Sequence, residues 1–264
     1  MSDQAKPYAK RSFGQNFLVD QNFIRKIVDA LRIVENEEII EIGPGRGALS
    51  DEILQRGGQL TAIELDRDMV EVLNAKFKHN NNFRLISEDA LKVHLAHLVI
   101  SPPAKLAANL PYYISTPILR RLIEFRGLFS SLVLMFQREV ADRITAKPGS
   151  KERGFLTVLV EASLSVEKLF NVPPTAFKPP PKVWSSVVRL TPKPSQVTDT
   201  KLFEQVVSTG FGQKRKTILN NLKLHFTDAG DALIAAEVDK NARAEALSLD
   251  DWIRLATALK AGKT

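Results

Sequence analysis

The chain has 264 residues, of which 44% are hydrophobic, and contains no cysteine. This length suits one large domain with a smaller one, and the absence of cysteine excludes disulfides and thiolate metal centres. Lysine and arginine total 37 against 30 acidic residues, and the net charge of +7 suits a polyanionic partner. Because no apolar run of about 18 residues and no apolar signal core is present, we expect a cytoplasmic protein without a membrane segment.

The first half of the chain predicts alternating strands and helices after a basic leader over residues 1–16. Asp20 is expected to cap a helix whose apolar face carries Phe23, Ile24, Ile27, Val28 and Leu31. A β-α-β-α order implies a doubly wound, mainly parallel sheet, a Rossmann-like α/β fold. The expected strands are 38–42, 60–65, 83–87, 104–108 and 132–136, and the expected helices are 48–56, 66–77, 115–124 and 138–144.

The second half changes character. A charged loop over 147–154 is followed by a proline-rich segment, a late strand over 183–190 and a linker over 191–195. From Asp199 onward the apolar spacing is purely helical. We therefore predict a domain over 1–195 and a small all-helical domain over 196–264.

The tetrapeptide Asn109-Leu110-Pro111-Tyr112 follows an expected buried strand. At the carboxyl end of such a strand, the Asn109 side-chain oxygen and the Leu110 carbonyl could accept hydrogen bonds from an amino group on a flat base. Tyr112 could stack on the ring of a base removed from its helix. A plain strand-end turn is the alternative, since asparagine and proline are common turn residues.

A glycine-rich loop follows the first expected strand of the sheet. Gly43 and Gly45 let the backbone turn and a ligand approach it closely, and Glu64 lies where ribose hydroxyls would be bound. The loop also fits the dinucleotide fingerprint, so it does not by itself distinguish between cofactors. Asp89, after the third strand, could accept a hydrogen bond from an adenine amine or could only cap the next helix.

The fourth strand end favours one cofactor. A nicotinamide-dependent reductase would be expected to place hydride-transfer chemistry there, whereas this chain has an amine receptor beside an aromatic ring. Carboxylates at two successive strand ends, followed by the tetrapeptide, fit S-adenosylmethionine beside an amino-bearing base. No metal site is expected, because His94 and His97 lack a third ligand.

Five motifs follow one another along the chain: Phe13–Leu18, Glu41–Leu49, Asn109–Thr116, Phe177–Ser185 (F-x-P-x-P-x-V-x-S) and Phe211–Leu222. In this order and spacing they resemble the rRNA adenine dimethyltransferase family over nearly the whole chain, and the last motif resembles the tail of its small-subunit branch. Arg46 and Tyr113 stand in variable positions of these motifs.

The resemblance implies dimethylation of two adjacent adenosines in the 3′-terminal hairpin of 16S rRNA in an assembling small ribosomal subunit. It implies that Asn16, Leu18, Gly43, Glu64, Asp89 and Asn109 contact S-adenosylmethionine or frame its site. Tyr112 and Phe177 are candidates to clamp the base, although Phe177 could instead be a core residue. Nothing demands a dimer, so we expect a monomer.

Several groups of basic residues are expected to bind the phosphate backbone of the RNA. Three other functions stay open at this point: a non-catalytic assembly factor, a nicotinamide-dependent reductase, and a methylase acting on large-subunit rRNA. The expected RNA contacts are Lys6, Lys10, Arg11, the 147–153 loop, Lys178, Lys182 and Lys214–Lys216.

Overall fold

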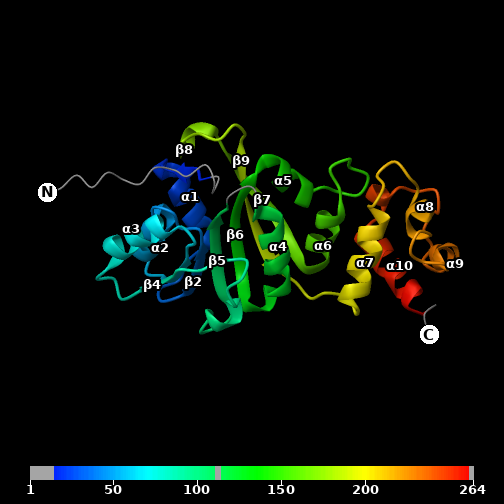
Figure 1. Cartoon of the computed structure of the whole chain (residues 1–264), viewed down its shortest axis with the longest axis horizontal. Coiled ribbons are helices and arrows are strands. Elements are labelled where there is room, and N and C mark those ends of the chain that lie inside the picture. The colour runs from blue at the N-terminus through cyan, green and yellow to red at the C-terminus, as the bar shows by residue number, and fades with distance from the viewer. Residues whose placement is uncertain (1–14, 111–113, 262–264) are drawn as a thin grey trace. The chain divides into compact units, whose positions relative to one another are not determined.

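A computed structural model describes residues 15–110 and 114–261 (Figure 1). The chain divides into two compact units, which are described separately: Met1–Ala141 with Glu167–Pro192, and Asp142–Val166 with Lys193–Thr264. Residues 142–166 thus group with the C-terminal helices. The domain boundary proposed from the sequence, between 195 and 196, stays a prediction.

The first unit is built on a seven-stranded sheet in the order β4-β3-β2-β5-β6-β9-β7. The five strands from β4 to β6 are parallel, and β9 runs antiparallel to β6, which confirms the predicted doubly wound, mainly parallel sheet. The strands are β2 (Glu38–Ile42), β3 (Gln59–Ile63), β4 (Phe83–Ile86), β5 (Ala104–Asn109), β6 (Phe129–Gln137), β7 (Leu164–Val172) and β9 (Ser185–Pro192).

Helices cover this sheet as the apolar spacing requires. In α1 the Asp20 carboxylate accepts hydrogen bonds from the backbone of Asn22 and Phe23, so the predicted cap is confirmed. The buried face of α1 packs on β5 and β6, which places the core between helix and sheet. The helices of this part are α1 (Gln21–Leu31), α2 (Ala48–Gln55), α3 (Arg67–Phe77), α4 (Ser115–Glu124) and α5 (Arg138–Ile144), which continues into the second unit after Ala141, with single turns η2 (Leu95–His97), η4 (Arg126–Leu128) and η5 (Pro174–Ala176).

A separate two-stranded sheet joins the N-terminal motif to the late proline-rich motif. Its strands are β1 (Phe17–Leu18) and β8 (Phe177–Lys178), paired antiparallel with Leu18 opposite Phe177. Segments far apart in sequence therefore meet at one place in the first unit.

The second unit is helical apart from the start of β7. Helix α6 packs against α7 and α10, and the fully buried Trp252 of α10 stacks on Phe211 with ring centroids 5.5 Å apart. No helix among the residues that the structure describes is long and apolar enough to cross a membrane. The helices are α6 (Phe155–Ser163), α7 (Thr200–Gly210), α8 (Ile218–Leu222), α9 (Ala229–Ala235) and α10 (Leu249–Ala261), with the single turn η6 (Ala244–Ala246).

Candidate cofactor and base-binding site

A cavity of about 620 Å³ lies in the first unit, where the parallel strands β2, β3 and β5 end. It is an open space of the size that small-molecule ligands occupy. Pro111 and Tyr112, also predicted for the site, lie outside the described residues. Among the predicted site residues, those lining the cavity are Asn16, Leu18, Gly43, Gly45, Glu64, Asp89, Asn109, Leu110 and Phe177.

The glycine loop adopts a backbone that other residues avoid. Gly45 and Gly47 have φ of +56° and +72°, and Gly47 stands directly before α2. A Cβ atom on Gly47 would lie 2.9 Å from the Phe77 ring, and one on Gly45 would lie 3.0 Å from the Phe17 ring. The loop therefore needs glycine both for its conformation and for its close contacts.

Glu64 connects this loop to the end of β3. Its carboxylate accepts hydrogen bonds from the backbone N–H of Gly45 at 3.0 Å and from those of Leu65 and Asp66 at 2.9 Å each. Burial raises the pKa of Glu64, while these three backbone bonds act to lower it. Because the Gly45 N–H donates to this carboxylate, it is not directed at a ligand pyrophosphate, which disfavours a dinucleotide.

Glu41 is a second buried carboxyl group in the cavity wall and was not singled out from the sequence. It is 1% exposed and accepts a hydrogen bond of 2.6 Å from the Ser50 hydroxyl. Burial raises its pKa to about 7, and the nearby Glu64 carboxylate adds to the rise. The available signal was an acidic residue inside an otherwise apolar strand.

Glu41 should make the stability of the ligand-free protein depend on pH. Its folded pKa of about 7 lies above the ordinary 4.5, so the folded state holds a proton that the unfolded state has released. The free energy of unfolding should therefore fall as pH rises from about 4.5 to about 7, by roughly 3 kcal/mol in all. Glu41→Gln, in urea denaturation at pH 5.5 and pH 8, should remove most of this fall.

A matched control is Glu71→Gln on the exposed face of α3, which should keep the wild-type pH dependence. The Ser50 hydroxyl can still donate to the amide oxygen of glutamine, so Glu41→Gln keeps this hydrogen bond. An unchanged fall of stability in Glu41→Gln would show that another group is responsible.

Asp66 and Asp89 line the cavity, and each also makes a local structural hydrogen bond. Asp66 caps α3 and accepts a hydrogen bond of 2.8 Å from the Gln15 side chain. Asp89 accepts a hydrogen bond of 2.9 Å from the backbone N–H of Leu91 and also lines the cavity. The local turn seen for Asp89 is thus compatible with ligand binding, because a carboxylate has two oxygens.

Asn109 is the last residue of β5 and is half-buried. Its side-chain nitrogen donates a hydrogen bond of 3.4 Å to the Asn16 carbonyl, which brings the N-terminal motif to the tetrapeptide. Because the amide nitrogen is the donor here, the oxygen Oδ1 lies on the opposite side of the amide group. Leu110, next along the chain, is buried and also lines the cavity.

The aromatic residues divide between the loop and the cavity wall. Phe17 lies against the glycine loop, and the Arg46 guanidinium stacks 4.3 Å from the centre of its ring. This stacking was not expected from the sequence, where Arg46 stands in a variable position. Phe177 is 4% exposed, belongs to the core and also lines the cavity, so both of its predicted roles remain compatible with the structure.

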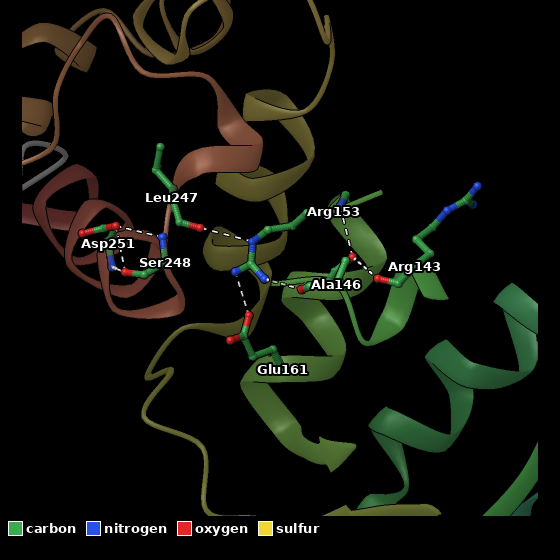
Figure 2. Close-up of polar contacts among 9 residues, drawn as sticks. Arg143, Ala146, Arg153, Glu161, Leu247, Ser248 and Asp251 are labelled. Carbon is green, nitrogen blue, oxygen red and sulfur yellow. Dashed lines mark hydrogen bonds and ion pairs between the residues drawn. The ribbon is translucent and has the colours of Figure 1, made fainter. Parts of the chain in front are cut away.

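Arg153, in the second unit, is expected from the sequence to be an exposed RNA contact, but the structure buries it (Figure 2). Its side chain is fully buried and donates to the Glu161 carboxylate at 2.7 Å and to the carbonyls of Ala146 and Leu247 at 3.2 Å each. The expectation that the whole 147–153 loop offers charge to RNA is therefore wrong at Arg153. Lys147 and Lys151 of this loop are exposed.

Comparison with known proteins agrees with this geometry. The family model for ribosomal RNA adenine dimethylase matches residues 7–261. "Ribosomal RNA small subunit methyltransferase A" of Hahella chejuensis is 44% identical over 94% of this chain and 92% of its own length, and that of Pseudomonas putida is 43% identical over 98% of both.

Two solved structures resemble the chain over most of its length. A dimethyladenosine transferase from Plasmodium falciparum has a TM-score of 0.77 with 28% identity over 90% of this chain and 95% of that one. The 23S rRNA methyltransferase ErmE has a TM-score of 0.71 with 25% identity over 93% and 100%. The chain therefore belongs to the ribosomal RNA adenine dimethylase family and is an S-adenosylmethionine-dependent methyltransferase.

Proposed function

We propose that this enzyme dimethylates the N6 atoms of two adjacent adenosines in the 3′-terminal hairpin of 16S rRNA, as a cytoplasmic monomer acting on an assembling small subunit. The observation that carries the chemistry is Asn109, held by Asn16 at the wall of an open cavity. The choice of the small subunit is supported by relatives of that name at 43–44% identity, against 25% for the 23S enzyme.

The residues present fit the cofactor. S-adenosylmethionine supplies an electrophilic methyl group on a sulfonium cation. In the cavity wall, Glu64 would accept hydrogen bonds from the ribose hydroxyls of this cofactor and Asp89 would accept one from its adenine amine, while the glycine loop offers close backbone approach. Asn16, Leu18, Gly43, Gly45, Glu64, Asp89 and Asn109 are the residues proposed to hold it.

Asn109 and Leu110 would prepare the base for transfer. The exocyclic amine of adenine is a poor nucleophile, because its lone pair is delocalised into the ring. Hydrogen bonds from this amine to Asn109 Oδ1 and to the Leu110 carbonyl favour a pyramidal nitrogen whose lone pair faces the methyl carbon. Positioning of this kind can contribute roughly 7–11 kcal/mol, and no strong base is required because the methylated nitrogen is acidic.

The other predicted contacts have roles in binding. Tyr112 and Phe177 would stack on the extruded adenine, and Pro111 would fix the backbone that presents the Leu110 carbonyl. Basic residues would hold the RNA backbone, with Lys6, Lys10 and Arg11 lying outside the described residues. Those that are exposed are Lys147, Lys151, Lys178, Lys182 and Lys214–Lys216.

The deciding experiment incubates the protein with labelled S-adenosylmethionine and, separately, with immature small subunits or large subunits. Primer extension then maps the modified nucleotides. Label on two adjacent adenosines near the 3′ end of 16S rRNA is expected. Label in large-subunit rRNA would reverse the substrate choice, and no label in either RNA would contradict the proposed substrate.

A further inference from the structure

Trp184 is an exposed aromatic residue that the function proposed so far does not use. Its exposed fraction is 47%, and its neighbour Val183 is 43% exposed. Among the described residues, the other large hydrophobic side chains that are similarly exposed are all aliphatic. It stands in a variable position of the F-x-P-x-P-x-V-x-S motif. A half-exposed indole gives up burial that would stabilise the fold, and such aromatics often mark binding surfaces.

Trp184 lies at the same end of the sheet's strands as Asn109, the proposed catalytic residue. Its carbonyl accepts a hydrogen bond of 2.9 Å from the backbone N–H of Arg138, and the next residue, Ser185, pairs with Gln137 of β6. On the other side of β6, Met135 pairs with Asn109. Regular strand spacing and rise then put the backbones of Trp184 and Asn109 roughly 14 Å apart.

Exposed cationic residues stand on the segments that adjoin Trp184. Arg138, Lys178 and Lys182 are exposed, and all three lie on the segments that lead to or from the sheet edge. The segment between Phe177 and Trp184 is attached at both ends, by the pairing of β8 with β1 and by the Arg138 bond. The indole and the cations thus occupy one rim of the first unit.

We propose that Trp184 stacks on a nucleotide that flanks the adenine bound in the cavity, with Lys182 near the adjoining phosphate. This inference rests on the proposed function. Extruding one base from a helix leaves its neighbours without a stacking partner, and an aromatic side chain can replace that partner whatever the base. Because the contact is remote from the transferred methyl group, it strengthens RNA binding and leaves the transfer step unchanged.

The test measures kcat and KM for methylation of immature small subunits with Trp184→Ala, Trp184→Leu and Trp184→Phe. Loss of one base–aromatic stack should raise KM roughly ten-fold or more in the alanine protein. The phenylalanine protein should recover most of the wild-type KM and the leucine protein should not, while kcat stays near wild type in all three. Ile100→Ala, at an apolar position that is still more exposed (74%), should leave both constants unchanged.

The outcomes separate this inference from the function on which it rests. If wild-type protein methylates small subunits and Trp184→Ala keeps the wild-type KM, the inference fails alone. If wild type does not methylate them, the proposed function fails. Recovery by leucine as complete as by phenylalanine would overturn stacking in favour of an apolar contact with a ribosomal protein. A fall in kcat with unchanged KM would overturn the assignment to RNA binding.

Discussion

Replacing Asn109 with alanine should lower kcat for methyl transfer by roughly 10²- to 10³-fold, the usual loss when a preorganised hydrogen-bonding group in an active site is removed. The alanine protein lacks the Oδ1 acceptor that would hold the adenine amine. It also lacks the nitrogen that donates to the Asn16 carbonyl. The rate is measured with labelled cofactor on immature small subunits, and the folded state is checked by urea denaturation.

Two further variants make this result specific. Asn74→Ala, on the exposed surface of α3, should transfer methyl groups at the wild-type rate. Asn109→Asp keeps an oxygen acceptor but loses the donor to Asn16, so its rate should lie between those of the alanine and wild-type proteins. Near-normal turnover by a folded Asn109→Ala protein would remove Asn109 from the mechanism.

Replacing Arg153 with alanine should destabilise the second unit by roughly 3 kcal/mol, because breaking a buried ion pair from one side leaves its partners without their donor. The loss should fall at the low end of the usual range, since the Glu161 side chain is 36% exposed and can be solvated. The carbonyls of Ala146 and Leu247 also lose a hydrogen bond (Figure 2).

The two tryptophans allow this loss to be located. Trp252 is buried in the second unit and Trp184 is exposed in the first, so Trp184→Phe leaves emission from Trp252 alone. In that background Arg153→Ala should shift urea unfolding to lower concentration, whereas the exposed Lys151→Ala should not. An Arg153→Ala protein as stable as Lys151→Ala would show that the buried guanidinium contributes little net stability.

The parts of the fold that could be predicted from sequence are those with a local physical signal. The sequence identifies Asp20 as a cap because it precedes an amphipathic stretch, and the structure confirms the cap. The glycine loop, Glu64 and Asn109 were predicted as one site because carboxyl ends of parallel strands meet at one edge, and all of them line the cavity. Their ligand contacts stay predictions.

The features that were missed depend on contacts distant in sequence. Helix α6 is almost entirely buried, so its sequence lacks the polar face that marks an amphipathic helix. The sequence places Arg153 among exposed charges, because no local pattern identifies Glu161 or the Leu247 carbonyl, 94 residues away, as its partner. The position of Trp184 depends on the pairing of β6 with β9, which no local pattern specifies.

The pairing of β1 with β8 has a consequence for the synthesis of this enzyme. Leu18 meets Phe177, so a strand made at the start of translation waits for one made 159 residues later (177 − 18). A nascent chain that has not yet released residue 177 from the exit tunnel lacks Phe177, one of the residues that line the cofactor cavity. The complete cavity therefore forms only after both ends of this strand pair have left the ribosome.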